Sequence, residues 1–381
     1  MPLTLHQNSQ RKIEDISGPW IEVDLDAISH NINQISQFRR TKLMPVVKAN
    51  AYGHGAVQVA RHLERLEAVH GLCVGVVREA IELRKSGLKI PLLNLGHYTQ
   101  TEAKRIVALN ISQSVFTDAV AWLNEAAGEQ THVAEVHIKI DTGLGRVGVP
   151  HHRALRFIEQ VASLANVRIA GVFTSLTEDL EFDKIQMKRF QTVLSQAEAR
   201  GISVGIKHVA SSAGILGYPE SDLDMIRPGI MVFGHYPSPA EWKLKRIDLK
   251  PALTLKTRVV YAKKLTRGDP IAYHQVYRAR RDETIITGGI GYSDGYPTSL
   301  AGRGECLIKG TRHPLIASLT ANHIYVRSSR DDIEPGEEIV LYGKQGKEEI
   351  TLEDIAQLSG HSVYELLTML SPFLPRFCSS G

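Results

Sequence analysis

The feature that most constrains the fold is a series of short apolar runs that recurs through the first 235 residues. The runs lie at 43–47, 72–77, 92–95, 113–116, 136–140, 169–173, 206–209 and 230–233. Most are separated by stretches with helical periodicity, which is typical of a parallel sheet covered by helices on both faces. Eight such strands fit a closed (β/α)8 TIM barrel. An open, doubly wound sheet is the alternative, because a strand count does not by itself show closure.

Local patterns predict individual elements around these runs. Residues 20–24 have the composition of a strand, and a helix is expected over about 26–38. A second, clearer helix is predicted over 182–197, where apolar residues fall at helical spacing. Asp183 is its candidate N-cap, and Gly201 follows just past its end.

The pattern changes near residue 250. Residues 253–260 alternate apolar and polar side chains, as a half-buried antiparallel strand does. Further strand-like segments lie at 284–290, 306–309, 315–317, 324–327 and 338–342. We therefore predict an α/β chain with a TIM barrel over 1–248 and a mostly β C-terminal domain over 249–381. The strand near 20–24 is a candidate to pack with this second domain.

Two short helices are predicted near the end of the second domain. Thr351 with Asp354, and Ser362 with Glu365, have the spacing of capping boxes. In a capping box the hydroxyl and the carboxylate each accept a hydrogen bond from a backbone amide at the start of the helix.

Composition excludes several classes of protein. Hydrophobic residues make up 43% of the chain and charged residues 23%, and the net charge is +4 with both signs interspersed. This balance argues against a nucleic-acid or membrane-surface partner. Cys73, Cys306 and Cys378 form no CxxC pair, which favours reduced thiols in the cytoplasm. Residues 1–18 lack the apolar core of a signal peptide, and no segment reaches membrane-spanning length.

The candidate catalytic group lies in the segment PVVKANAYGHG, residues 45–55. An apolar run stops at Lys48, and a glycine-rich turn follows. Barrel enzymes place their chemistry at the carboxyl ends of the strands, where this lysine would lie. A buried lysine loses proton affinity, and a neutral amine can form a Schiff base. Taken alone, a lysine at this position is more often a solvated residue that closes an ordinary strand, because charged side chains are mostly exposed.

The complete segment resembles the lysine motif of the alanine racemases, which bind pyridoxal 5'-phosphate (PLP). The resemblance extends from Trp20 to Arg376. It implies a fold-type-III enzyme that interconverts L- and D-alanine, with Lys48 holding PLP. It further implies a cytoplasmic homodimer with shared active sites that supplies D-alanine as a peptidoglycan precursor.

A second segment, VHIKIDTGLGRVG at 136–148, contains a GxGxxG pattern. A dinucleotide-binding motif needs an acidic residue at the next strand end, but the candidate Glu159 lies within a helix. We therefore interpret the glycines as coincidental. The segment resembles the racemase motif in which a carbamylated lysine, here Lys139, supports a substrate-facing arginine, here Arg146. A carbamate is an anion that can pair with a guanidinium.

Two segments at the end of the barrel, 207–214 and 224–230, have the hydroxyls and glycines that suit a phosphate site. The resemblance assigns the cofactor phosphate to Tyr52, Ser212 and the backbone of Gly229 and Ile230. It places Arg227 against the pyridine nitrogen. A guanidinium does not readily give up a proton, so it would keep that nitrogen unprotonated.

The resemblance implies that the second domain supplies the opposing base. Tyr273 corresponds to the catalytic tyrosine, which comes from the neighbouring subunit in this family. Lys48 and Tyr273 would then exchange protons on opposite faces of the substrate's Cα. Tyr292 corresponds to a tyrosine at the substrate entrance, and Ala321 and Asn322 occupy the positions of a methionine–aspartate pair near the substrate.

Several residues depart from the family pattern. Ser175 stands in place of a histidine, Ser211 in place of an asparagine, and Pro372 in place of a tyrosine, besides Ala321 and Asn322. These changes would widen the pocket, so a racemase of broader or different specificity is an alternative to one that prefers alanine.

A decarboxylase and a non-catalytic cofactor carrier are two alternative classes of protein. A fold-type-III decarboxylase would share the barrel and the lysine, but it carries a cysteine-bearing substrate motif, and Cys306 lies away from the tyrosine motifs. A non-catalytic cofactor carrier would need only the barrel. No metal is expected, because the neighbouring residues His151 and His152 would not face the same way on a helix.

Overall fold

The computed structural model describes residue 13 and residues 16–380. Residues 1–12, 14–15 and 381 lie outside the described residues. The expectation that residues 1–18 form no signal peptide therefore concerns a segment that is mostly not described. The chain forms two compact units. One comprises residues 27–51 and 56–250. The other comprises the residues up to Asp26, Tyr52–Gly55 and the residues from Pro251 onward. Each is described separately.

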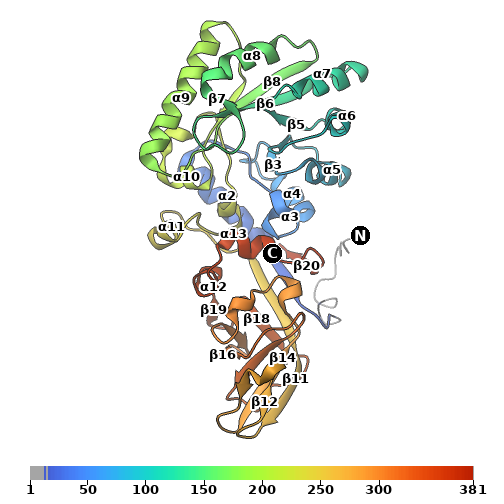
Figure 1. The fold of residues 1–381 in the computed structure, drawn as a ribbon, viewed down its shortest axis with the longest axis vertical. Coiled ribbons are helices and arrows are strands. Elements are labelled where there is room, and N and C mark those ends of the chain that lie inside the picture. The colour runs from blue at the N-terminus through green and yellow to red at the C-terminus, as the bar shows by residue number, and fades with distance from the viewer. Residues whose placement is uncertain (1–12, 14–15, 381) are drawn as a thin grey trace. The chain divides into compact units, whose positions relative to one another are not determined.

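The first unit is a closed barrel of parallel strands in the order β2-β10-β9-β8-β6-β5-β4-β3 (Figure 1). The strands are β2 (Lys42–Leu43), β3 (Leu72–Val74), β4 (Leu92–Asn94), β5 (Ser112–Val115), β6 (Ala134–Asp141), β8 (Val167–Phe173), β9 (Ile206–His208) and β10 (Met225–Ile226). One parallel bridge joins Leu43 of β2 to Val69, which precedes β3, and another joins Val46, which follows β2, to Cys73 of β3. These bridges complete the ring, so the predicted barrel is confirmed and the open sheet is excluded.

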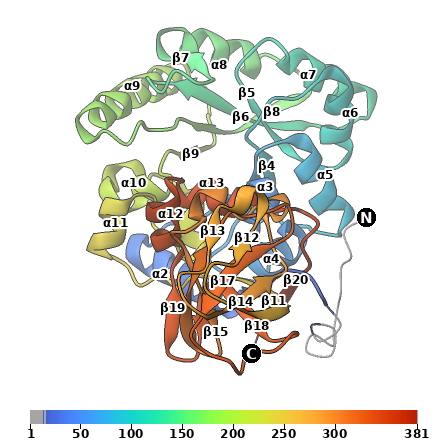
Figure 2. The ribbon, with the colours of Figure 1, turned by 60° about the horizontal axis from the view of Figure 1, so that its bottom comes forward.

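Helices cover the outside of the barrel, as Figure 2 shows for α5 to α9. The helices of this unit are α2 (Leu25–Arg39), α3 (Lys48–Tyr52), α4 (Ala56–Leu63), α5 (Val77–Lys85), α6 (Gln100–Ala108), α7 (Val120–Glu129), α8 (Ala154–Ala162), α9 (Leu180–Ala199), α10 (Ser212–Gly217) and α11 (Pro239–Leu244). Helix α9 buries Met187, Phe190 and Val193 at helical spacing. Its length agrees with the sequence pattern.

The N-cap predicted for α9 was wrong. Asp179 caps the helix, because its carboxylate accepts a hydrogen bond from the amide of Phe182 at 3.0 Å. Asp183 lies in the first turn and is buried, and its carboxylate accepts hydrogen bonds from the amide and the hydroxyl of Thr177, both at 2.9 Å. Aspartate is a favoured N-cap residue, so the residue types alone do not identify the cap. The backbone does, because Asp179 is extended and Asp183 is already inside the helix.

The last apolar run was also assigned wrongly. Residues Ile230–Phe233 form a 3-10 helix, η3, and the eighth strand is Met225–Ile226, which pairs with β2 and β9. Pro228 has no amide hydrogen for a strand ladder, and the chain turns at Gly229. The run is fully buried, and burial explains its hydrophobicity without a strand.

The second unit is an antiparallel sheet to which one parallel edge strand is added. Its order is β19-β18-β15-β16-β17-β14-β11-β1-β20, with β1 and β20 parallel. The strands are β1 (Trp20–Asp24), β11 (Leu253–Leu265), β14 (Glu283–Gly288), β15 (Glu305–Ile308), β16 (Thr311–Ile316), β17 (Ile324–Ser328), β18 (Glu338–Gln345), β19 (Glu348–Ile350) and β20 (Arg376–Ser379). Strand β1 pairs with β11, so this early segment completes the sheet of the second unit.

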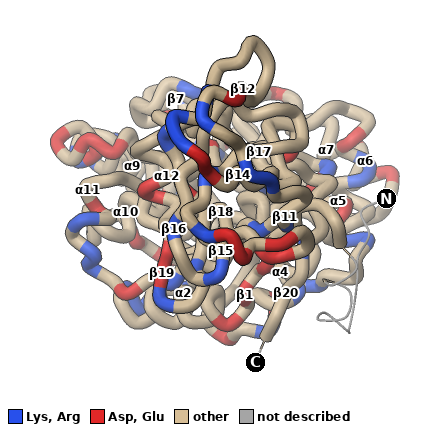
Figure 3. Tube along the Cα trace, turned by 90° about the horizontal axis from the view of Figure 1, so that it is seen from below, with Lys and Arg blue, Asp and Glu red and all other residues tan. Residues whose placement is uncertain are grey.

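Short helices and ion pairs complete this unit. Capping boxes open α12 (Leu352–Ser359) and α13 (Val363–Met369), as predicted. Basic and acidic residues are interspersed along the chain trace (Figure 3). Arg312 on β16, for example, pairs with Glu305 on the neighbouring strand β15 at 3.0 Å and with Glu348 on β19 at 2.7 Å. Such exposed pairs contribute about 0–1 kcal/mol each, so apolar burial dominates the stability of the sheet.

Asn31 on α2 provides a test of the barrel's polar packing. Its fully buried amide donates to the carbonyls of Val232 (3.1 Å) and Lys250 (2.9 Å) and accepts from the Lys250 amide (2.8 Å). We expect Asn31→Ala to lower the free energy of unfolding by about 2–4 kcal/mol, because it leaves buried groups unpaired. Urea denaturation measures this. Asn33→Ala, on the exposed face of the same helix, is the control. Equal, small effects of both would contradict the assignment.

Candidate active site

Lys48 lies where the segment after β2 ends, at the carboxyl side of the barrel. Gly75, which follows β3, leaves room for its side chain, because a Cβ on Gly75 would lie 3.2 Å from the Cβ of Lys48. Burial lowers the pKa of the Lys48 amine, and the Arg146 charge lowers it further, while Glu79 opposes the shift. The result is an amine that loses its proton more readily than an ordinary lysine side chain does.

The backbone after Lys48 forms a left-handed turn. The φ angles are 52° at Ala49, 56° at Asn50, 53° at Ala51 and 49° at Tyr52. For residues with a Cβ, this conformation costs about 1–2 kcal/mol each. Strain of this kind is found at functional sites where the surrounding structure enforces it.

Side chains of the barrel hold this turn in place. The Glu79 carboxylate on α5 accepts hydrogen bonds from the amides of Ala49 (2.6 Å) and Gly75 (2.8 Å). The Asn50 side chain accepts one from the Ala56 amide at 2.8 Å. Glu79 therefore ties the loop after β3 to the residue that follows Lys48.

Lys139 projects from β6 and is 5% exposed. Burial, with added repulsion from Arg146 and Arg227, lowers the pKa of Lys139 to about 8, although Asp141 partly offsets the effect. Its ammonium lies 5.6 Å from the centre of the Phe173 ring. Arg146 itself is exposed in the loop after β6. The structure thus brings the charges of Lys48, Lys139 and Arg146 close enough to influence one another.

Arg227 follows β10 and is 5% exposed. One terminal nitrogen donates to the Nδ1 atom of His208 (2.6 Å) and to its carbonyl (2.7 Å). The other donates to the carbonyls of Thr174 and Val209, both at 3.0 Å. Burial lowers the pKa of Arg227 to about 10, so the group stays charged at neutral pH. Among the N–H donors of this guanidinium, only Nε–H has no acceptor within the described part of the chain.

The predicted phosphate-site residues fall into two groups. Ser212 and Gly229 are brought together, because the Ser212 hydroxyl accepts a hydrogen bond from the Gly229 amide at 3.0 Å. Ile230 follows at the start of η3. Tyr52 belongs to the other unit, where its ring lies 6.1 Å from that of Tyr364.

The predicted residues of the second unit also form two groups. The Asn322 amide donates to the Ser293 hydroxyl at 3.0 Å, and the Ser293 amide donates to the Ala321 carbonyl at 3.1 Å. These contacts join the turn that carries Tyr292 to the turn at 320–322. Tyr273 lies in a separate short helix, η4 (Tyr273–Gln275), and is 74% exposed. Tyr292 is 54% exposed.

Sequence reasoning missed several residues that shape the site. Glu79 lies in the first turn of an ordinary amphipathic helix, and the N-cap residue Val76 has no side-chain acceptor, so no capping-box pattern marks Glu79 in the sequence. Gln186 on α9 is fully buried and donates to the Thr142 hydroxyl and the Ser175 carbonyl, both at 3.1 Å. A buried glutamine in the middle of a helix is the signal that could have identified it.

Clustered metal ligands and membrane-spanning helices are both absent from the described residues. Over residue 13 and residues 16–380, no group of three or more His, Cys, Asp or Glu side chains is arranged to hold a metal ion. Among the helices of this same part of the chain, none combines the length and hydropathy that a bilayer crossing needs.

Comparison with known proteins identifies the family. The model of the alanine racemase N-terminal domain matches residues 23–237, and that of the C-terminal domain matches residues 252–378. An alanine racemase of Carboxydothermus hydrogenoformans is 38% identical over 364 residues, which cover 94% of this chain and 98% of the relative.

Solved structures agree with this comparison. The alanine racemase of Clostridium difficile 630 superposes with a TM-score of 0.90 at 34% identity, over 96% of both chains. A histidine racemase from Leuconostoc mesenteroides subsp. sake superposes with a TM-score of 0.87 at 26% identity, over 96% of this chain and 99% of the other. The chain belongs to the alanine racemase family, and the family predicted from its sequence is confirmed.

The contacts of Glu79 generate a prediction. We expect Glu79→Ala to lower the free energy of unfolding by about 1–3 kcal/mol, because the Ala49 and Gly75 amides lose their charged acceptor. Glu79→Gln should recover part of this loss, since it keeps one carbonyl oxygen. Urea denaturation gives the values. Glu82→Ala, at an exposed position on the same helix, is the control. A loss at Glu79 no larger than that at Glu82 would show that the turn does not need the carboxylate.

Proposed function

We propose that the chain is a PLP-dependent racemase that interconverts L- and D-alanine by a two-base mechanism. The observation that carries this proposal is the Lys48 amine, whose pKa is lowered by partial desolvation and by the Arg146 charge, at the carboxyl end of a barrel strand. Membership of the alanine racemase family and the printed names of the relatives support it.

The residues present fit PLP. Lys48 would hold the cofactor covalently, and Ser212 with the amides of Gly229 and Ile230, and with Tyr52, would bind its phosphate. The unused Nε–H of Arg227 is a donor suited to an unprotonated ring nitrogen. When bound, PLP withdraws electrons from the substrate and thereby acidifies the hydrogen on its Cα.

Arg227 would then influence the outcome of the reaction. Its four hydrogen bonds fix the guanidinium, and its pKa of about 10 means that it does not release a proton at neutral pH. Beside such a donor a bound ring nitrogen would stay unprotonated, which would limit the electron withdrawal that the cofactor supplies. This favours return of a proton to Cα over competing transamination.

The two bases would be the Nζ atom of Lys48 and the Oη atom of Tyr273, on opposite faces of Cα. The barrel domain, residues 1–248, would supply the lysine, and the domain over 249–381 would supply the tyrosine. Because Tyr273 is 74% exposed, its phenol needs a further surface to exclude water. A homodimer in which each subunit lends Tyr273 to its partner provides that surface.

Lys139 and Arg146 would bind the substrate carboxylate together. With a pKa of about 8, Lys139 has enough neutral amine near pH 8 to react with carbon dioxide. The resulting carbamate is an anion among cations, so it would relieve their repulsion and hold the Arg146 guanidinium. Tyr292, Ala321 and Asn322 would line the entrance to the site.

The biological setting is part of the proposal. A cytoplasmic enzyme that supplies D-alanine for peptidoglycan agrees with the family. The broader specificity predicted from Ser175, Ser211 and Pro372 stays a prediction. The neighbour described as a histidine racemase shows that this fold occurs in a protein named for a larger amino acid.

The first test concerns Lys48. We expect Lys48→Ala to abolish the visible absorbance of bound PLP and to lower racemisation at least about 1,000-fold, since it removes both anchor and base. Absorbance spectra and chiral chromatography measure these. Lys42→Ala, at an exposed position on β2, is the matched control. Retention of the visible band in Lys48→Ala would remove Lys48 from its role.

The second test concerns Tyr273. We expect Tyr273→Phe to slow exchange of the α-hydrogen of L-alanine about 100- to 10,000-fold, and to slow that of D-alanine much less, because Lys48 remains. Proton NMR in D2O follows the exchange for each enantiomer. Tyr261→Phe, at another exposed tyrosine, is the control. Equal losses for both enantiomers would contradict the assignment of Tyr273 to one face.

A further inference from the structure

His137 and His208 form a buried pair inside the barrel. The Nδ1 atom of His137 lies 2.8 Å from the Nε2 atom of His208, and the side chains are 4% and 0% exposed. The Nδ1 atom of His208 in turn lies 2.6 Å from a terminal nitrogen of Arg227. A continuous chain of hydrogen bonds therefore runs from β6 through β9 to the guanidinium.

The Arg227 guanidinium at one end of this series of hydrogen bonds determines which atom donates and which accepts in each of them. A guanidinium only donates, so the Nδ1 atom of His208 must accept, and the proton of this neutral ring must be on Nε2. That Nε2–H points at the Nδ1 atom of His137, which must accept as well. His137 therefore carries its own proton on Nε2. Each ring has a single tautomer that is compatible with the contacts.

The surrounding residues favour this arrangement. Phe173 stacks on His208, with ring centres 4.8 Å apart and an interplanar angle of 10°. A Cβ on Gly171 would lie 2.4 Å from the Nδ1 atom of His137, so β8 leaves space for the ring only because this residue is glycine. Burial and the Arg227 charge lower the pKa of His137 to about 3, and burial also lowers that of His208.

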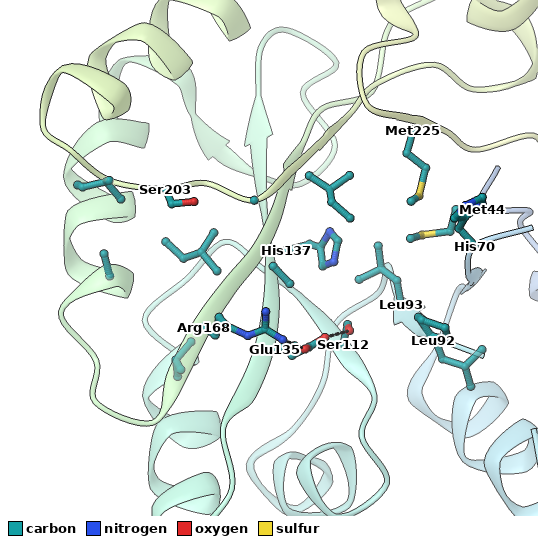
Figure 4. A pocket seen from close by; sticks show the side chains of 18 of the residues that line it. Met44, His70, Leu92, Leu93, Ser112, Glu135, His137, Arg168, Ser203 and Met225 are labelled. Atoms are coloured by element: carbon teal, nitrogen blue, oxygen red, sulfur yellow. Dashed lines mark hydrogen bonds and ion pairs between the residues drawn. The ribbon is translucent and has the colours of Figure 1, made fainter. Parts of the chain in front are cut away.

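A cavity of about 850 Å³ reaches His137 from the amino-terminal end of the barrel. Figure 4 shows the His137 ring among the side chains that line the cavity, which include Met44 just after β2 and Met225 on β10. Toward the rim, Glu135 accepts a hydrogen bond from Ser112 at 3.2 Å and pairs with Arg168, which is 64% exposed. His137 thus lies between this cavity and the guanidinium proposed to face the cofactor.

We propose that His137 is a positioning residue that orients Arg227 by fixing the tautomer of His208. This inference rests on the proposed function, because it assigns Arg227 to the cofactor ring. Without an acceptor at His137, the Nε2–H of His208 would be buried and unpaired. The His208 ring would then change tautomer or rotate, and Arg227 would lose the partner that sets the direction of its Nε–H.

The first measurement uses the protein without cofactor. Two-bond ¹H–¹⁵N spectra of ¹⁵N-histidine-labelled protein report the tautomer of each ring, with His208→Gln and His137→Phe giving the assignments. We expect His208 to be protonated on Nε2 alone, and its nitrogen shifts to change in His137→Phe. A His208 proton on Nδ1, or shifts unchanged by His137→Phe, would overturn the proposal.

The second measurement uses the PLP-loaded enzyme. We expect His137→Phe to lower kcat about 10- to 100-fold and to shift the visible absorbance maximum of the bound cofactor. His137→Gln, whose carbonyl can accept the same hydrogen bond, should restore most of both. His70→Ala, at an exposed position on the cavity wall, should change neither. A spectrum unaltered by His137→Phe, or a Gln variant as impaired as the Phe variant, would contradict a positioning role.

Chemical rescue provides an independent variant. Because the cavity leads to His137, added imidazole should partly restore the absorbance maximum and kcat of His137→Ala, and should leave Lys48→Ala inactive. Absence of rescue in a folded His137→Ala protein would count against the proposal. The spectra without cofactor do not depend on PLP binding, so failure of the proposed function would leave that result interpretable.

Discussion

The site depends on how the barrel accommodates several cations at the carboxyl ends of its strands. Lys139 and Arg227 are buried, Lys48 is more exposed, and the Arg146 charge acts on both lysines. Desolvation and mutual repulsion both disfavour further protonation of the lysines. Arg227 remains charged because carbonyls and an imidazole satisfy its terminal nitrogens, so the lysines are the groups that give up protons most readily.

The scaffold fixes these groups through backbone strain and buried hydrogen bonds. The left-handed turn after Lys48 is unfavourable by itself, and Glu79 and Asn50 hold it. Gly75 and Gly171 act at close approaches, where a Cβ would collide with Lys48 or His137. A carbamate at Lys139 and a cofactor phosphate would both add negative charge where the chain has concentrated positive charge. The proposed chemistry is therefore consistent with the electrostatics of the barrel.

The sequence predicted what depends on local patterns. The strands, the capping boxes at Thr351 and Ser362, and the position of Lys48 at a strand end follow from periodicity and spacing. Two predictions were wrong. Residues 230–233 are apolar because they are buried, and not because they form a strand. Asp179 and Asp183 are both suitable N-cap residues, and the sequence pattern did not distinguish them. The roles of Glu79 and His137 could not be predicted, because their partners come from other strands and helices. Such partners are determined by the closed barrel and not by the neighbouring sequence.

The most direct test of this account is an NMR titration of the lysine side chains in protein free of PLP and carbon dioxide. Lysines labelled with ¹³C at Cε report each amine, and Lys48→Arg and Lys139→Arg assign the two signals. We predict that Lys139 titrates near pH 8, and that Lys48 titrates below the ordinary value of 10.5. Titration of both amines at 10.5 or above would show that the barrel does not lower their proton affinity, and would contradict the account.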